Sequence, residues 1–299
     1  PELDIHLSTQ ANNTNYRSAL FWHKLGVKRI ILARELSLIE IRQIRDNTPD
    51  SLELEAFVHG AMCMSYSGRC TISNYLTGRD ANRGECTQPC RWRYFIVEEK
   101  RPGQFMPIEE DDRGTYLFNS KDLCMLDHIT ELVRAGLSSF KIEGRMKSSY
   151  YVACVVSAYR KELDRYINDP VGYSFDRKSM DELKKVSHRP FTTGFYFGKD
   201  NNITYYESSS YIRGYDFVAI LLENVVDKEL ILVEQRNHFR KGDILEIVQP
   251  GESNLEYEVK EMYDEKMNLI TSAPHPQQKI YLPFIGRLKP WSLFRRKIT

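Results

Sequence analysis

Strand-like and helix-like segments alternate through the first half of this chain, and this alternation restricts the fold more than any other feature. The short apolar, strand-like segments are residues 4–10, 29–35, 52–60 and 138–145. The amphipathic, helix-like segments are residues 14–26, 36–47 and 122–136. Strands that alternate with helices indicate a parallel sheet with right-handed crossovers.

The number of these units suggests a larger closed fold. Four strand–helix units make half of a (β/α)8 barrel, and a parallel sheet needs covered faces and paired edges. We therefore predict the C-terminal half of a TIM-type barrel, with its N-terminal half absent from this chain or replaced by a partner chain. A small open α/β sheet is the alternative.

The pattern changes in the second half. Residues 146–169 and 179–186 have helical spacing, and short alternating strands separated by turns such as Lys241–Gly242–Asp243 follow from about residue 210. Short strands with such turns are typical of a small antiparallel barrel. We predict a partial-barrel domain over residues 1–200 and a small β-barrel domain over residues 201–299.

The composition narrows the class of protein. The 42 Lys and Arg residues nearly balance the 41 Asp and Glu residues, so any nucleic-acid surface must be local. Apolar runs such as residues 217–222 are far shorter than the ~20 residues of a membrane span. The chain opens without a signal-peptide pattern, and its six cysteines are too sparse for a disulfide scaffold. We expect a soluble cytoplasmic protein.

Most of the cysteines are clustered, at positions 63, 70, 86 and 90. Cys63 follows the strand predicted at 52–60, at the end where parallel barrels carry their chemistry. Cys124 is expected to begin the helix at 122–136 and to fold back to the same face. Converging thiolates can hold a tetrahedral metal or an iron–sulfur cluster, and the lack of paired C-x2-C knuckles favours the cluster. Unrelated free cysteines are the alternative.

Five segments carry a family resemblance: EAFVHGAMCMSYSGRCTIS (55–73), NRGECTQPCRW (82–92), SKDLCML (120–126), SFKIEGRMKSSYYV (139–152) and RPFTTGFYFG (189–198). In this order they resemble the motifs of the collagenase-like peptidase family. They are most similar to the branch that makes 5-hydroxyuridine at the wobble position of tRNA, using prephenate. Sister branches hydroxylate a ribosomal RNA cytidine or assist ubiquinone hydroxylation. The resemblance implies a barrel with a 4Fe–4S cluster and a short C-terminal β-domain.

The resemblance also implies roles for the cysteines. It carries the cluster ligands to Cys63, Cys70, Cys86 and Cys124, with Cys90 as the competitor of Cys86. The thiol left over, which we take to be Cys90, is a candidate for a catalytic role in redox chemistry or substrate contact. Cys154, within an apolar helical segment, is expected to be a small buried core residue.

Charged residues near the cysteines are further candidates. Arg69, Arg79, Arg83 and Arg91 could stabilise thiolates or bind RNA phosphate or a dicarboxylate substrate, and ordinary solvated arginine is the alternative. Glu143 and Arg145 end the last predicted strand and are candidate catalytic residues, for substrate positioning or proton transfer. The alternative for Glu143 is a structural ion pair with Lys141 or Arg145.

Two further strand residues and four basic residues of the C-terminal domain are also candidate functional residues. Glu55 and His59 lie four residues apart on one predicted strand, so their side chains are expected on the same side. The basic residues expected to hold a tRNA backbone on the C-terminal domain are Arg240, Lys241, Arg287 and Lys289.

The resulting hypothesis is a tRNA-modifying enzyme that uses a cluster and a small-molecule hydroxyl donor. A peptidase is the alternative that the family name suggests, but neither G-x-S-x-G nor H-E-x-x-H occurs in the sequence. A non-catalytic subunit that binds RNA or a partner is the third possibility.

Overall fold

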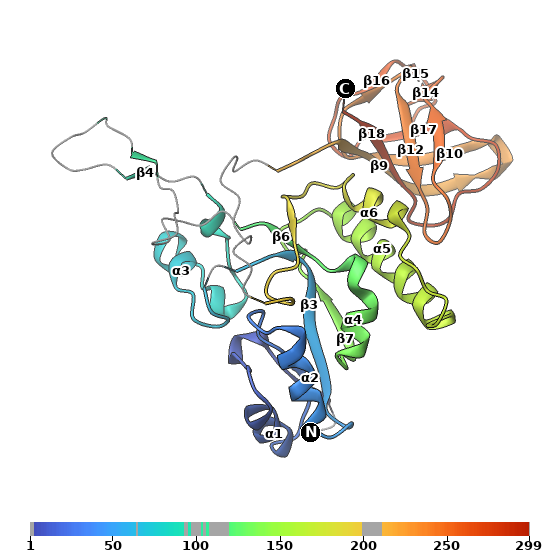
Figure 1. The fold of residues 1–299 in the computed structure, drawn as a ribbon. Helices are drawn as coiled ribbons and strands as arrows, with labels where there is room; N and C mark the ends of the chain where they lie inside the picture. Colours follow the sequence, from blue (N-terminus) through green and yellow to red (C-terminus); the bar gives the residue numbers. More distant parts are fainter. Residues whose placement is uncertain are drawn as a thin grey trace. The chain divides into compact units, whose positions relative to one another are not determined.

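The computed structural model describes residues 3–63, 65–92, 95–96, 103, 106–107, 120–198 and 211–298 (Figure 1). The chain divides into two compact units. Unit 1 comprises residues 1–147, 162–175 and 188–212, and unit 2 comprises residues 148–161, 176–187 and 213–299. In the described parts, no helix combines the length and apolar character needed to cross a membrane.

Four parallel strands form the centre of unit 1. They are β1 (Ile5–Leu7), β2 (Val27–Ile31), β3 (Glu53–Ala61) and β7 (Ser139–Ile142), paired side by side in chain order. The intervening helices are α1 (Tyr16–Lys24), α2 (Leu38–Asp46) and α4 (Ile129–Arg134). The predicted alternation is confirmed, while the closure of these strands into half of a barrel stays a prediction.

Local sequence explains where the first helices begin. The Asn15 side chain caps α1 by accepting the backbone N–H of Ser18. Ser37 and Glu40 cap α2 reciprocally, each side chain accepting the backbone N–H of the other. Because such caps satisfy N–H groups that a helix leaves unpaired, they fix the start of each helix.

The strand β6 (Asp122–Cys124) was not predicted. His59 pairs with Cys124 in β6 and with Ile142 in β7, so β6 takes the place beside β3 beyond the end of β2. The predicted helix at 122–136 is therefore wrong at its start, and helical backbone begins only at η4 (Leu126–His128). A short apolar run does not by itself distinguish a buried strand from a helix.

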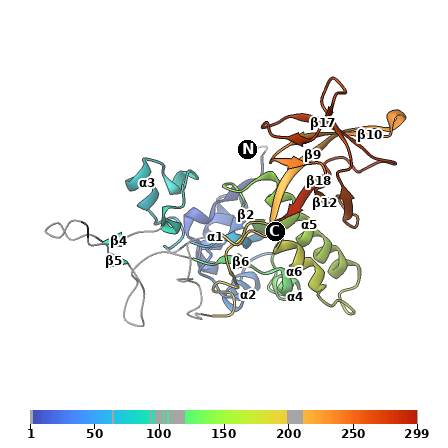
Figure 2. The same ribbon diagram turned by 90° about the horizontal axis from the view of Figure 1, so that it is seen from above.

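The core of unit 1 lies between the sheet and its helices. Its fully buried apolar side chains include Ile30, Leu54, Val58, Ile41, Ile44, Ile129 and Leu132. The segment between β3 and β6 carries η2 (Ala81–Arg83), η3 (Pro89–Arg91), α3 (Ile72–Thr77) and the antiparallel pair β4 (Phe95–Ile96) and β5 (Met106–Pro107) (Figure 2). The remaining short elements of unit 1 are η1 (Thr9–Ala11) and β8 (Phe191–Thr192), which pairs with β6.

Unit 2 is built around a curled antiparallel sheet with strand order β13-β12-β18-β9-β10-β17-β14-β15. The strands are β9 (Tyr215–Val225), β10 (Leu230–Gln235), β12 (Ile244–Val248), β13 (Leu255–Glu258), β14 (Met262–Tyr263), β15 (Leu269–Ile270), β17 (Lys279–Pro283) and β18 (Leu293–Lys297). A separate pair is formed by β11 (Phe239–Arg240) and β16 (Ser272–Ala273), and η5 (Val226–Lys228) follows β9. The predicted antiparallel strands are confirmed, and the boundary at residue 200 stays a prediction.

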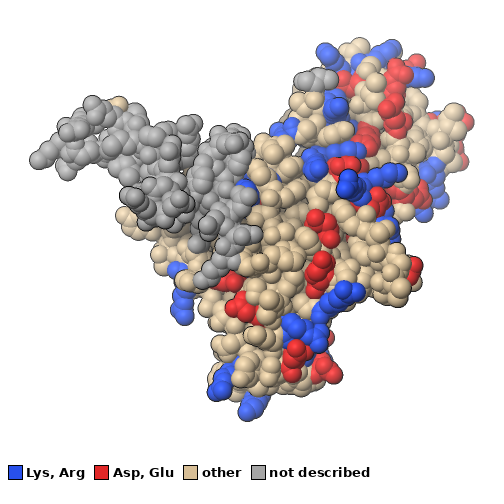
Figure 3. All heavy atoms as spheres, viewed as in Figure 1, with Lys and Arg blue, Asp and Glu red and all other residues tan. Residues whose placement is uncertain are grey.

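Helical segments complete unit 2. The predicted helices are present as α5 (Ser149–Asn168), whose first part belongs to this unit, and α6 (Arg177–Leu183). Arg295 on β18 is fully buried and donates to Glu246 at 2.8 Å and to Glu182 on α6 at 2.6 Å. On the visible face of the sheet, basic and acidic side chains are interspersed (Figure 3).

Candidate functional site

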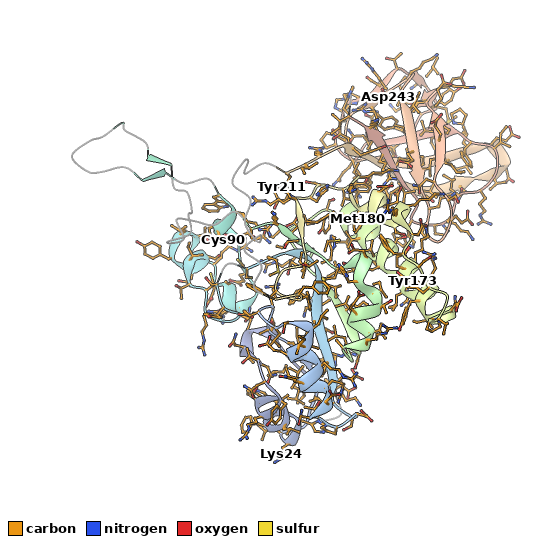
Figure 4. The ribbon with its side chains drawn as sticks, in the orientation of Figure 1. Lys24, Cys90, Tyr173, Met180, Tyr211 and Asp243 are labelled. Atoms are coloured by element: carbon orange, nitrogen blue, oxygen red, sulfur yellow. The ribbon has the colours of Figure 1, made fainter. Side chains whose placement is uncertain are left out.

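Four cysteines gather beyond the carboxyl end of β3. Cys63 lies two residues after this strand, Cys70 and Cys86 flank α3 and η2, and Cys90 lies in η3 (Figure 4). The thiols of Cys63 and Cys90 each interact electrostatically with those of Cys70 and Cys86. The long insertion between β3 and β6 therefore folds so that its four cysteines share one region.

The surroundings of these thiols favour the protonated form. Desolvation raises the pKa of the Cys63 thiol, and the charge of Arg34 opposes this shift. Burial raises the pKa of Cys90 to about 12, against the charge of Arg91. Since a metal binds the thiolate, binding at this site would release protons.

Cys124 reaches the same end of β3 by a different route from the one predicted. It closes β6 instead of beginning a helix, it is buried, and it pairs with His59 on β3. The ligand set Cys63, Cys70, Cys86 and Cys124 stays a prediction. In the described parts of the chain, no three His, Cys, Asp or Glu residues are arranged to hold a metal ion.

Arg34 contacts a thiol of this region directly, and sequence reasoning missed it. Its Nη1 donates to Cys63 Sγ at 2.8 Å, and its guanidinium carbon lies 3.7 Å from the centre of the Phe57 ring. Nη2 lies 4.0 Å from Glu143 Oε2. The signal was available, because Arg34 follows the carboxyl end of β2 just as Glu143 follows that of β7.

Hydrogen bonds and close packing from other elements hold the loop between Cys63 and Cys70 in place. Ser67 donates its backbone N–H and its hydroxyl to the Glu35 carboxylate, at 2.5 and 3.1 Å. Gly68 has φ +74°, and a Cβ there would overlap the Gln10 carbonyl. The Gln10 amide in turn donates to the Ala81 carbonyl at 2.7 Å. The loops after β1 and β2 therefore hold the cysteine segment in place.

The two candidate catalytic residues after β7 have specific partners. Glu143 accepts the backbone N–H of Arg145 at 3.1 Å, and its carboxylate lies 4.0 Å from Arg34 Nη2. The Arg145 guanidinium donates to the Cys86 carbonyl. The expected partner Lys141 instead lies 3.5 Å from Glu55. Both candidates thus lie beside the cysteine segment, and their catalytic roles stay predictions.

Glu55 and His59 contact different groups. Glu55 accepts hydrogen bonds from Ser139 at 2.7 Å and from Arg29 at 3.3 Å, which is a structural network between β2, β3 and β7. His59 is buried, and burial lowers its pKa to about 4 although the charge of Asp122 opposes this. His59 is therefore neutral near pH 7.

The four candidate arginines divide into two kinds. Arg69, Arg79 and Arg83 are exposed. Arg91 is buried and donates to Asp122 at 2.8 Å and to Ser120 at 3.3 Å. The backbone N–H of Arg189 also donates to Asp122, at 3.0 Å. This network ties η3, which carries Cys90, to β6, which carries Cys124.

Tyr211 borders this network. Its phenol lies 3.5 Å from Arg91 Nη1, and Lys147 Nζ lies 3.9 Å from its ring centre. Burial by itself would raise the pKa of Tyr211, but the charges of Lys147 and Arg91 outweigh burial and lower it. Figure 4 shows Tyr211 and Cys90 in the same part of unit 1. Sequence reasoning did not single out Tyr211, Lys147 or Asp122.

Exposed aromatic side chains accompany the exposed arginines. Tyr66 and Tyr75 expose 72% and 86% of their surface, and Trp92 exposes 48%. Aromatic rings interleaved with arginines suit unpaired nucleic-acid bases and their phosphates.

Comparisons with known proteins agree with this architecture. Residues 1–205 match the model of peptidase family U32, and residues 213–295 match its C-terminal domain. The chain is 36% identical to "tRNA hydroxylation protein P1" of Bacillus subtilis over 99% of this chain and 70% of that protein. It is also 36% identical to "tRNA hydroxylation protein P" of Escherichia coli, over 95% of this chain and 70% of that protein. A further relative is the E. coli "23S rRNA 5-hydroxycytidine C2501 synthase", 34% identical over 71% of this chain and 32% of that protein. The chain therefore belongs to peptidase family U32.

Proposed function

We propose that this chain hydroxylates RNA, with the wobble uridine of tRNA as substrate and 5-hydroxyuridine as product. The observation that carries the proposal is the group of four cysteines beyond the carboxyl end of β3. Relatives named for tRNA and rRNA hydroxylation support the reaction class. The exposed arginines and aromatic rings of the cysteine segment support an RNA substrate.

The proposed cofactor is a 4Fe–4S cluster held by Cys63, Cys70, Cys86 and Cys124. The donor types fit this group, because thiolates bind iron and N–H donors commonly surround cluster sulfurs. Such donors are present: Arg34 donates to Cys63 Sγ at 2.8 Å and the Gln88 backbone donates to Cys86 Sγ at 3.3 Å. A bound cluster would supply the redox or Lewis-acid chemistry that side chains alone lack.

The proposed hydroxyl donor is prephenate, a dicarboxylate. The exposed arginines Arg69, Arg79 and Arg83 are suited to bind its carboxylates or the RNA phosphates, because a planar guanidinium binds such groups through two hydrogen bonds. Glu143 and Arg145, which lie beside the cysteine segment, would orient the donor or the base. An unpaired wobble base can reach such a site without being flipped out of a duplex.

Nucleoside mass spectrometry tests the proposal. In cells deleted for this gene, tRNA should lack 5-hydroxyuridine and its derivatives, and the wild-type gene should restore them. Cys63→Ser should fail to restore them, whereas Cys154→Ser, a change at a buried cysteine in unit 2, should succeed. Unchanged 5-hydroxyuridine in the deletion strain, with no redundant enzyme present, would refute the tRNA substrate.

The same strains test the second candidate, hydroxylation of a ribosomal RNA cytidine, which the 34% identical relative favours. Loss of 5-hydroxycytidine from ribosomal RNA with intact tRNA nucleosides would support it. A peptidase, the alternative from the family name, predicts normal nucleosides in both RNAs and peptide cleavage by the purified protein.

A further inference from the structure

The environment of Arg34 is unusual for a structural arginine. Only 11% of its side-chain surface is exposed, and its Nε is buried without a hydrogen-bond partner in the described parts of the chain. Among the described residues, its side chain makes a close polar contact with the Cys63 sulfur at 2.8 Å, while the Glu143 carboxylate lies at 4.0 Å. The guanidinium therefore contacts the cysteine region directly, and the Glu143 carboxylate lies outside hydrogen-bond distance.

These contacts leave the guanidinium incompletely satisfied. A guanidinium offers five N–H donors, and a neutral thiol is a weak acceptor. A buried donor of a charged group that lacks a partner costs more than a neutral donor left in the same state. The guanidinium therefore keeps donor capacity, at Nε among its N–H groups, for a negatively charged acceptor bound beside Cys63.

The position of Arg34 is also fixed independently of the thiol. Its guanidinium stacks on the buried Phe57 ring at 3.7 Å, and Glu35, its neighbour in the chain, anchors Ser67 of the cysteine loop. Because the ring and the loop hold it, the guanidinium is pre-organised and need not be ordered by a ligand.

We propose that Arg34 is a positioning residue for the cluster, donating to the Cys63 thiolate and to a cluster sulfur, and that it raises the reduction potential of the cluster. The inference rests on the proposed function. Reduction adds negative charge, and a fixed cation with N–H donors at the sulfurs stabilises the reduced form more than the oxidised form.

Redox titration of the reconstituted protein tests this role. We would compare wild type, Arg34→Gln, Arg34→Lys and the control Arg42→Gln, an exposed arginine on α2 that pairs with Asp46. Iron and sulfide per chain are measured first, and the potential is then measured by spectroelectrochemistry. At the wild-type midpoint, Arg34→Gln should lower the ratio of reduced to oxidised cluster about tenfold, which is about 59 mV for one electron. The reduction potential of Arg34→Lys should lie between those of Arg34→Gln and the wild type, because lysine keeps the charge but lacks the planar guanidinium.

The possible results separate this inference from the proposed function. A full iron content with wild-type potential in Arg34→Gln would overturn the role of Arg34 alone. If Arg34→Gln assembles no cluster, a lowered potential in Arg34→Lys supports the inference and an unchanged potential there overturns it. Wild-type protein that takes up no iron would refute the cluster, and with it both proposals. Arg42→Gln should match the wild type throughout.

Discussion

Replacing Asp122 by Asn should destabilise unit 1 strongly. Asp122 is fully buried and accepts from Arg91 at 2.8 Å and from the Arg189 backbone at 3.0 Å. At this separation and an effective dielectric constant of about 20, the attraction between the two charges is about 6 kcal/mol. Desolvation offsets part of this attraction, but removing one partner leaves a buried charge uncompensated, which typically costs 3–5 kcal/mol.

The pKa of Asp122 indicates whether desolvation or the attraction to Arg91 is the larger effect. Burial by itself would raise it, but the charge of Arg91 and the Arg189 backbone hydrogen bond outweigh burial and lower it. The ionised pair therefore contributes stability above the ordinary aspartate pKa of about 3.9, and the contribution is lost as the pH falls through the lowered folded-state value.

Urea unfolding at pH 7 is the assay. Asp122→Asn should lower the free energy of unfolding by about 3–5 kcal/mol, whereas Asp46→Asn, which breaks an exposed pair with Arg42, should cost under about 0.5 kcal/mol. The double variant Asp122→Leu with Arg91→Met should lose less than the sum of its two single variants, because neither member of the pair is left buried without its partner. A loss below about 1 kcal/mol in Asp122→Asn would show that the pair does not hold η3 to β6 as we argue.

Three further predictions follow from other sites. Glu246→Gln should lower the free energy of unfolding by about 2 kcal/mol at pH 7. Hydrogen bonds and charges from Arg295 and Lys185 outweigh burial and lower the pKa of Glu246 to about 2. The difference between variant and wild type should therefore vanish in urea titrations as the pH falls from 4.5 through about 2. Gly68→Ala should lower unit 1 stability by about 1–3 kcal/mol, since φ +74° and the Gln10 carbonyl leave no room for a Cβ, and a wild-type melting temperature would contradict this. Replacing Cys63, Cys70 or Cys124 by serine should abolish iron uptake, whereas Cys154→Ser should keep it. Loss of iron in either Cys86→Ser or Cys90→Ser decides which of these two cysteines is the ligand. Full iron content in the serine variants of Cys63, Cys70 and Cys124 would refute the ligand set.

The sequence by itself determined the order of the parallel strands, the helices between them and the change to antiparallel strands after residue 210. These features follow from hydrophobic periodicity, which is local and can be read over a dozen residues. It also placed Cys63 correctly beyond the end of β3, because the residue that follows a strand is fixed by where the strand ends. The clustered cysteines by themselves suggested a metal or iron–sulfur site, and the family motifs added the ligand set and the reaction, which no local pattern specifies.

The tertiary structure alone decided β6 and the polar partners of the site. The run at 122–126 is apolar enough for a helix or a buried strand, and pairing with β3 selects the strand. Arg34 and Cys63 are 29 residues apart in the chain, and Arg91 and Asp122 are 31 apart. Nothing local marks such residues as partners. Arg34 and Cys63 meet because the parallel sheet brings the carboxyl ends of β2 and β3 to one edge. Arg91 and Asp122 come from η3 and β6, and burial makes each of these two charges depend on the other.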